Sequence, residues 1–439
     1  MVSRIEQMVL KFRNVLAETE RLDPHDLRTY QEALLQPLLQ HARQHSAFYR
    51  GRLDPVLGRG EPDFARWSEL PILTRAEAQA KGTALSAKQV PPHLGTVSRD
   101  ETSGSTGRPL RFLKTELTDV AGLAMTDRLY RWWGMDGRKR LASFVSPRRG
   151  VKPGTVQRGW RQGFPQGEHL VRETSGDMAA HVDWLAAANA SYLISYSSLL
   201  PSMASIVLDR RERLPMERIV ARGGVVTAEM RALCLDAFGA GIADQYGADE
   251  IGQIACECPH CGAYHVSAEG VFLEVVDESG AAVGAGATGR VLLTNLYNYA
   301  MPLIRYEIGD MAVVAGPDRS CPIRLPRLEK IIGRYRNVFR LRDGRVLFPN
   351  MPMSGFRKYI PCQQLQVVQT SFERIEVRYV EDGSGRPADS IGLETWMRNY
   401  LDPCFQVEAV VVDEIPRSPS GKYEDFVSVV DGAGPTGSI

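Results

Sequence analysis

Apolar residues recur at helical spacing over roughly the first 90 residues of the chain. Within this region the stretch 27–53 has a long helical periodicity, and Thr74 is placed to cap the start of a short helix. From about residue 100 to residue 330, short apolar runs alternate with helical stretches. Examples are the apolar runs 192–196, 218–224 and 289–296 and the helical stretch 227–239. This alternation predicts a large N-terminal α/β domain of packed sheets and helices.

The pattern changes again near residue 334. Two short apolar runs flank Asp343-Gly344, which is typical of a β-hairpin. The sequence then predicts paired strands within 365–385, a helix at 388–401 and a strand at 408–415. We therefore expect an α/β domain over 1–333 and a small, mobile α+β domain over 334–430, joined by a hinge. The tail 431–439 is expected to be disordered.

Charge and composition exclude several classes of protein. The chain has 53 basic and 52 acidic residues and a net charge of +1, so its bulk charge does not indicate nucleic-acid or membrane-surface binding. No apolar run approaches the roughly 18 residues of a membrane span, and the first residues lack a signal-peptide layout. Seven cysteines, three of them within residues 256–261, indicate a reduced protein with a metal site rather than a disulfide framework. We therefore expect a cytoplasmic protein.

A run of glycines and hydroxyl-bearing residues follows Glu101. Glycines let the backbone approach a ligand closely, and serine and threonine hydroxyls can donate hydrogen bonds to phosphate oxygens. The spacing is not that of a Walker A loop, and a mobile surface loop is the alternative interpretation. The run consists of Thr102, Ser103, Gly104, Ser105, Thr106 and Gly107.

Four stretches further along carry residues suited to nucleotide chemistry. They are 244–252, with an aromatic ring and acids, 301–310, ending in an aspartate, 331–337, where the composition changes, and 414–426, which presents Lys422 on a turn. Each of them could be ordinary packing, a turn cap or a solvated lysine, because short motifs match often by chance. Their occurrence together, in this order, is much harder to attribute to chance.

Together with the glycine-rich run, these stretches resemble the adenylate-forming superfamily of acyl-CoA synthetases and adenylation domains. Within it, the chain looks most like phenylacetate-CoA ligase and the related coenzyme-synthetase-like proteins. The stretches 41–53 and 70–75 resemble that subgroup's opening helix and the proline-marked segment after it, and 193–200 resembles the strand and loop of its acyl pocket. The resemblance covers nearly the whole chain.

The resemblance implies chemistry in two steps. A carboxylic acid attacks the α-phosphate of ATP to give an acyl-adenylate and pyrophosphate, and a nucleophile, usually the thiol of coenzyme A, then displaces AMP. Lys422 would clamp the carboxylate and the α-phosphate, and Glu250 would hold Mg²⁺. The nucleotide would be bound by the run Thr102–Gly107 at the phosphates, Gly223, Gly224, Tyr246 and Gly247 around the adenine, and Asp310 and Arg334 at the ribose. The small domain would rotate between the steps and remove the lysine.

The expected substrates are aromatic carboxylic acids, because the subgroup favours them. Phenylacetate-like, benzoate-like and anthranilate-like acids all stay open. The acyl pocket would be lined by Tyr196, Ser197, Tyr246 and Gly247, and Arg222 is a candidate partner for a polar group of the acid.

The chain departs from the family pattern at the predicted phosphate site and at the hinge. Asp249 stands where the family has Ser or Thr, and a second carboxylate at this place repels phosphate. Arg336 and Asn337 replace the acidic pair of the hinge. Two alternatives to an aryl-acid:CoA ligase therefore stay open. One is an enzyme of secondary metabolism that transfers the acyl group to an amine or to a carrier-protein thiol, and the other is a catalytically dead homologue that binds nucleotide.

A separate cluster of possible metal ligands lies between residues 256 and 265. Its sulfur and nitrogen donors suit a tetrahedral Zn²⁺ ion, and four protein ligands would make the site structural rather than catalytic. The expected ligands are Cys256, Cys258, Cys261 and His265. His260 or Cys321 could replace one of them, and a set of reduced, metal-free thiols is the alternative.

Overall fold

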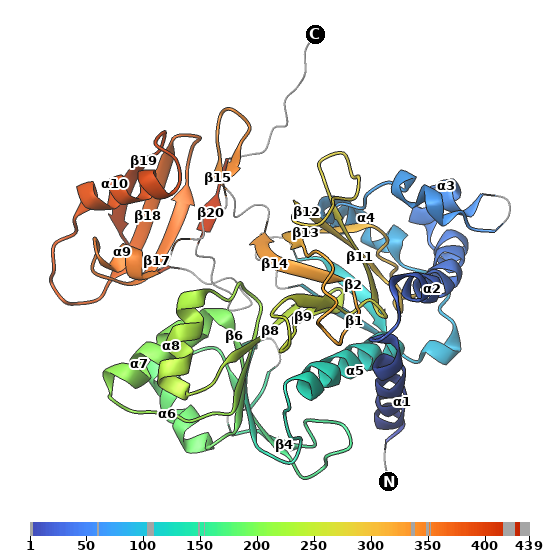
Figure 1. Ribbon diagram of the computed structural model, residues 1–439, viewed down its shortest axis with the longest axis horizontal. Helices are drawn as coiled ribbons and strands as arrows, with labels where there is room; N and C mark the ends of the chain where they lie inside the picture. Colours follow the sequence, from blue (N-terminus) through green and yellow to red (C-terminus); the bar gives the residue numbers. More distant parts are fainter. Residues whose placement is uncertain are drawn as a thin grey trace. The chain divides into compact units, whose positions relative to one another are not determined.

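The computed structural model describes most of the chain in two compact units, one ending at Ile331 and the other beginning at Ile332. The described residues are 3–58, 61–102, 109–147, 150–152, 154–334, 339–347, 351, 353–415 and 426–430. The expected tail 431–439 lies outside them. Each unit is described by itself (Figure 1).

The first unit contains eight of the described α-helices and most of the described strands, and it includes all but the last three residues of β14. Its helices are α1 (Arg4–Thr19), α2 (Pro24–His45), α3 (Asp54–Leu57), α4 (Arg75–Leu85), α5 (Glu116–Trp132), α6 (Met178–Ala188), α7 (Leu200–Asp209) and α8 (Ala228–Phe238). Its strands are β1 (Val97–Glu101), β2 (Arg111–Thr115), β3 (Leu141–Val145), β4 (Val156–Arg158), β5 (Glu168–Glu173), β6 (Tyr192–Tyr196), β7 (Arg218–Arg222), β8 (Ile242–Ala248), β9 (Gly252–Glu257), β10 (Tyr264–Val266), β11 (Val271–Val276), β12 (Thr288–Asn295), β13 (Tyr306–Val314) and β14 (Arg327–Arg334). None of the helices in the described residues is long and apolar enough to cross a membrane.

Twelve of these strands form one sheet, in the order β11-β12-β13-β14-β10-β9-β8-β7-β6-β3-β5-β4. The strands β5, β3, β6, β7 and β8 run parallel to their neighbours in this group, which is typical of strands linked by helical crossovers. Antiparallel pairing begins where β9 joins β8 and includes the β11-β12-β13 ladder. The strands β1 and β2 form a separate antiparallel pair.

Helices cover both faces of the parallel strands (Figure 1). On β7, Ile219 and Ala221 are buried in a cluster with α6, α7 and α8, whereas Val220 is buried on the other face with Leu129 and Tyr130 of α5. This period-two alternation, with apolar residues on both sides, is what a strand buried between two helical layers requires. Because these strands run parallel, their carboxyl ends lie together at one edge of the sheet.

Local sequence signals set the helix boundaries. The Thr74 hydroxyl accepts a hydrogen bond from the Glu77 amide at the start of α4, which confirms the predicted cap. Thr227 caps α8 in the same way, through the Met230 amide. At its other end α8 stops at Gly239, whose φ of +65° is a left-handed conformation that glycine adopts at little cost.

The second unit is an α+β unit with its own core. Its elements are β15 (Phe339–Arg340), β16 (Val346–Leu347), α9 (Met353–Arg357), β17 (Cys362–Gln369), β18 (Arg374–Glu381), α10 (Ser390–Tyr400), β19 (Gln406–Val411) and β20 (Phe426–Ser428). The strands β19-β18-β17-β20 form one sheet, and β15 pairs with β16 across the predicted turn at Asp343-Gly344. Leu393 and Met397 of α10 are buried in the same cluster as Val367 of β17. The fold class predicted from the sequence, a large α/β part and a small α+β part, is confirmed.

Candidate active site

The predicted adenine and acyl-pocket residues lie where neighbouring parallel strands end. Gly223 and Gly224 directly follow β7, and Tyr246 and Gly247 lie near the end of β8, the next strand of the sheet. Ser197 follows β6 on the other side of β7. Open α/β sheets bind their ligands at this edge, outside the carboxyl ends of the strands.

The backbone conformation or the close packing at this edge requires glycine at three positions. Gly223 has a φ of +79°, which other residues rarely adopt. A Cβ atom on Gly224 would collide with the Ser197 hydroxyl, and one on Gly247 would lie 2.8 Å from the carbonyl oxygen of Gly252. The loop after β7 can therefore lie directly against Ser197, so a predicted adenine residue and a predicted acyl-pocket residue are in contact.

Glu250, the predicted metal ligand, is buried and held through one of its two oxygens. Its Oε1 accepts hydrogen bonds from Arg75 Nη1 at 2.7 Å and from the Tyr306 hydroxyl at 3.0 Å. Its Oε2 makes no hydrogen bond to the residues that the structure describes. A carboxylate oxygen of this kind is the ligand that Mg²⁺ prefers, so the arrangement fits a metal bound through Oε2.

Arg75 also holds the start of the predicted phosphate loop. Its Nη2 donates to the Thr102 hydroxyl at 2.7 Å, and that hydroxyl accepts a second hydrogen bond from the Leu110 amide at 2.9 Å. The Thr102 amide in turn donates to the Leu110 carbonyl at 2.9 Å. One guanidinium thus joins Thr102, where the glycine-rich run begins, to Glu250, which lies between β8 and β9.

The charges within this network are consistent with an ion pair. Burial alone would lower the pKa of Arg75, but the neighbouring Tyr306 and Glu250 outweigh it and raise that pKa. Burial and the Glu250 carboxylate raise the pKa of Tyr306 above its ordinary value. Tyr306 therefore keeps its proton and donates a hydrogen bond to Glu250, and Arg75 stays positively charged beside the carboxylate.

Asp310, which is predicted to bind the ribose, is hydrogen-bonded to Tyr246, which is predicted to lie beside the adenine. The Tyr246 hydroxyl, from β8, donates a hydrogen bond of 2.7 Å to Asp310 Oδ2, from β13. Both side chains are partly exposed. Tyr246 thereby fixes the orientation of the Asp310 carboxylate at the surface of the first unit.

Several predicted site residues lie outside what the structure describes. They are Ser103, Gly104, Ser105, Thr106 and Gly107 of the glycine-rich run, and Lys422. Arg334 is the last residue of β14, and its side chain also lies outside the described part. Their roles stay predictions from the sequence. Asp249, which departs from the family pattern, is exposed.

Sequence reasoning missed the roles of Arg75 and Tyr306. Both stand in stretches that carry the family resemblance, 70–75 and 301–310, so a signal was present. Their pairing with Glu250 depends on α4 and β13 lying beside the turn between β8 and β9, which no local pattern reveals.

Four possible metal ligands converge at a second place in the first unit. The ligand atoms of Cys258, Cys261, His265 and Cys321 all lie within 4.8 Å of one another. Cys258 Sγ lies 3.8 Å from Cys321 Sγ, Cys261 Sγ lies 3.7 Å from His265 Nε2, and His265 Nε2 lies 3.3 Å from Cys321 Sγ. Sulfur atoms bound tetrahedrally to one zinc ion at about 2.3 Å are about 3.8 Å apart, so the spacing fits zinc.

The set differs from the expected one because Cys321 takes the place of Cys256. The strand β9 ends at Glu257, so Cys258 leaves the strand and turns toward the loop that carries Cys321. Cys256 stays inside the strand, buried among apolar side chains that include Leu129 of α5. The expectation that Cys256 belongs to the cluster is therefore wrong, and Cys321, the alternative ligand, is brought in from 56 residues beyond His265.

The imidazole of His265 is oriented as a metal ligand needs to be. Its Nδ1 lies 3.0 Å from the Leu325 carbonyl oxygen, to which only an N–H group can donate. This contact places the proton on Nδ1 and leaves the lone pair of Nε2 directed at the cysteine sulfur atoms. A histidine held by a carbonyl through its other nitrogen is the usual arrangement in zinc sites.

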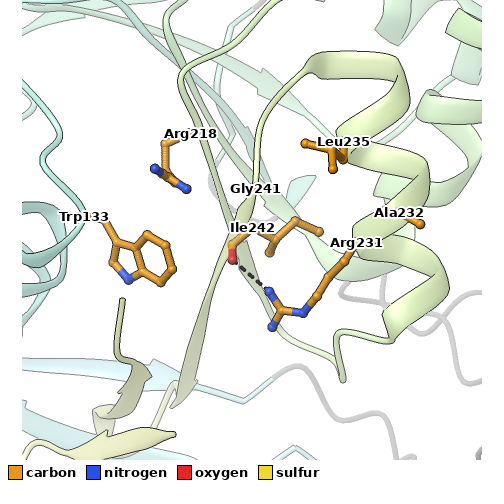
Figure 2. Close-up of a pocket in the computed structure, with 7 residues that line it drawn as sticks. All are labelled: Trp133, Arg218, Arg231, Ala232, Leu235, Gly241 and Ile242. Atoms are coloured by element: carbon orange, nitrogen blue, oxygen red, sulfur yellow. Dashed lines mark hydrogen bonds between the residues drawn. The ribbon is translucent and has the colours of Figure 1, made fainter. Parts of the chain in front are cut away.

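A shallow pocket of about 340 Å³ lies at the opposite end of the parallel strands. It is lined by Trp133, Arg218, Arg231, Ala232, Leu235, Gly241 and Ile242. Figure 2 shows Arg231 beside the Ile242 carbonyl, to which it donates a hydrogen bond of 2.9 Å. Arg218 and Ile242 are the first residues of β7 and β8, so this pocket is separate from the residues at the carboxyl ends of these strands.

Comparison with known proteins yields solved structures of similar fold. No family model and no curated protein matches the chain. A 2-hydroxyisobutyryl-CoA ligase in the postadenylation state, in complex with R3-HIB-AMP, has a TM-score of 0.72 and 16% identity over 95% of this chain and 92% of that chain. The same ligase with 2-HIB-AMP and CoA in the thioesterification state has a TM-score of 0.62 and 17% identity, over 94% of this chain and 91% of that chain. The amide bond synthetase McbA from Marinactinospora thermotolerans has a TM-score of 0.52 and 16% identity, over 74% of this chain and 66% of that chain.

These similarities define the fold. The chain has the fold of these ligases over nearly its whole length, which is the fold that the resemblance to the adenylate-forming superfamily implies. The finer resemblance to phenylacetate-CoA ligase stays a prediction.

Proposed function

We propose that the chain is an AMP-forming acid ligase, which activates an aromatic carboxylic acid with ATP and transfers the acyl group to coenzyme A. The observation that carries this proposal is the bridge made by Arg75 between Thr102 and Glu250. It connects Thr102, where the glycine-rich run predicted to bind phosphate begins, with the buried carboxylate of Glu250. The Oε2 atom of that carboxylate would bind the metal ion.

The candidate side chains would each contribute to binding and orientation. Glu250 would hold Mg²⁺ through Oε2, and the ion would neutralise charge on the phosphates. Asp310, oriented by Tyr246, would accept hydrogen bonds from the ribose hydroxyls. Gly224 and Ser197 would form the floor between the adenine and the acyl group. Lys422, from the second unit, would supply the positive charge between the carboxylate and the α-phosphate.

The first test measures release of pyrophosphate and AMP from ATP across a panel of aromatic acids, each with and without coenzyme A. We expect at least one acid to give sustained turnover only when CoA is present. Acid-dependent exchange between ATP and pyrophosphate that CoA leaves unchanged would instead support transfer to an amine or a carrier protein. If the chain binds ATP but no acid induces exchange, the proposed activity is wrong and the nucleotide-binding homologue is favoured.

We also propose that Cys258, Cys261, His265 and Cys321 hold one structural zinc ion. Four protein ligands complete a tetrahedral shell, so the ion would stabilise the turn after β9 rather than bind substrate. It would tie the segment that precedes β14 to this turn, through Cys321.

Replacing Cys321 by serine should therefore remove the zinc, while the same change at Cys256 should not. We expect elemental analysis to find about one zinc per chain in the parent protein and in Cys256→Ser, and almost none in Cys321→Ser. Chelation should lower the melting temperature of the parent protein and leave that of Cys321→Ser unchanged. Zinc that survives in Cys321→Ser but is lost in Cys256→Ser would contradict this ligand set.

A further inference from the structure

Arg222 is a cationic side chain without an ionic partner, in the part of the chain that the structure describes, and it lies next to the predicted acyl pocket. It is the last residue of β7 and lies directly before Gly223 and Gly224. In the β6–β7 ladder it is paired with Tyr196, and its guanidinium carbon lies 5.1 Å from the centroid of the Tyr196 ring. Because Val220 faces α5, Arg222, two residues further along the strand, faces the same side.

The contacts of Arg222 leave most of its hydrogen-bonding capacity unused. Its Nη2 donates one hydrogen bond of 2.9 Å, to the Phe144 carbonyl. Its Nε is buried and has no hydrogen-bond partner among the described residues. No carboxylate of those residues lies within ion-pair distance of Arg222. A guanidinium offers five donors in a planar fork, and one carbonyl and one aromatic ring use only a fraction of them.

The side chains around Arg222 add donors rather than an anion. His169 of β5 and Ser143 of β3 are hydrogen-bonded to each other on this side of the sheet. Burial and the charge of Arg222 lower the pKa of His169 to about 4, which keeps its imidazole neutral. Tyr130 of α5 lies close enough to interact electrostatically with both Arg222 and Asp127. Asp127 is already paired with Arg161 at 2.8 Å. Among the residues that the structure describes, the group around Arg222 therefore offers no carboxylate to pair with it.

We propose that Arg222 determines substrate specificity by pairing with a second carboxylate of the acid, so that the substrate is a dicarboxylic acid. This inference rests on the proposed function, because it takes the space beside Tyr196 and Ser197 as the acyl pocket. A partly desolvated guanidinium is costly without a counter-ion, and a carboxylate matches its fork with two parallel hydrogen bonds. Attack on ATP uses the other carboxylate, so the two groups of the substrate have separate partners.

The test compares matched pairs of acids that differ by one carboxylate. Benzoate is paired with isophthalate, phenylacetate with 3-carboxyphenylacetate, and butyrate with glutarate. Binding to the full chain is measured by calorimetry, and ATP–pyrophosphate exchange is measured with the same acids. In at least one pair we expect the diacid to bind about tenfold more tightly than the monoacid.

Substitution of Arg222 should remove this preference selectively. Arg222→Met keeps the length of the side chain without its charge, and we expect it to lose about tenfold in affinity for the diacid with no loss for the monoacid. Arg222→Lys keeps the charge without the fork and should recover part of the preference. Arg218→Met is the matched control, because Arg218 stands on the same strand, lies 4.8 Å over Trp133 and also has a buried Nε without a partner among the described residues. It should leave binding of both acids unchanged.

The binding data separate this inference from the proposed function. If diacid binding depends on Arg222 but no acid supports exchange, the inference stands and the ligase activity is wrong. If exchange occurs but no diacid is preferred, or if Arg222→Met weakens both members of a pair equally, the inference is wrong and the ligase activity stands. Melting curves of the three variants establish that each is folded.

Discussion

Replacing Lys422 by alanine is expected to slow acyl-adenylate formation by about 10²–10³-fold, the usual effect of removing one preorganised charge from a transition state. The lysine lies outside the described residues, and its role rests on the turn sequence of 414–426 and on the family resemblance. A compact ammonium on a flexible stem suits a charge that is needed in one step and withdrawn in the next. The measurement is acid-dependent ATP–pyrophosphate exchange by the variant and the parent protein.

The same variant distinguishes a catalytic lysine from a structural one. If Lys422 acts only in the first step, Lys422→Ala should convert a supplied acyl-adenylate and CoA into thioester at nearly the parent rate. Lys358→Ala is a suitable control, because Lys358 is an exposed lysine of the second unit. Exchange at the parent rate in Lys422→Ala would show that another group supplies the charge.

Local signals predicted those parts of the fold that depend on neighbouring residues. Thr74 caps α4 as expected because an N-cap hydrogen bond spans only three residues. The hairpin at Asp343-Gly344 follows from the left-handed conformation of Gly344, with a φ of +84°. The run 192–196 forms β6 with the predicted bounds, because a short apolar run buried on both faces has few other stable conformations.

The parts of the site that could not be predicted depend on long-range packing. Arg75 and Glu250 are 175 residues apart, and nothing in the sequence near either residue indicates the other. For the metal cluster, the close spacing of Cys256, Cys258, Cys261 and His265 predicted that all four ligands come from one short stretch of the sequence. The end of β9 at Glu257 separates Cys256 from the others, and the boundary of a strand is set by its partners as much as by its own residues. Cys321 could be named only as an alternative, because its approach depends on the path of the chain before β14.

Arg75→Ala is expected to lower kcat/KM for Mg-ATP by roughly 10²-fold, because three charge-assisted hydrogen bonds, to Glu250, Tyr306 and Thr102, are lost. Glu250 would lose its ion pair and Thr102 its contact to the same guanidinium. The Glu250 side chain is only 4% exposed, so its charge would be left buried without a counter-ion. We therefore also expect the free energy of unfolding to fall by about 2–3 kcal/mol, less than for a fully buried pair because the Arg75 side chain is partly exposed.

A second substitution separates the two effects of Arg75. When Arg75→Ala is combined with Glu250→Gln the buried charge is gone, so most of the lost stability should return. Activity should not return, because the neutral amide that replaces the carboxylate would lack the negative charge for a metal ion, and the contact between Thr102 and the Arg75 guanidinium would still be lost. Arg52 pairs at 3.0 Å with Glu77, which lies on the same helix as Arg75, and this pair is more exposed than the Arg75–Glu250 pair. Arg52→Ala is therefore the matched control. It should leave the KM for Mg-ATP unchanged. If the double variant regains activity along with stability, Arg75 serves only to neutralise Glu250, and the bridge to Thr102 has no part in nucleotide binding.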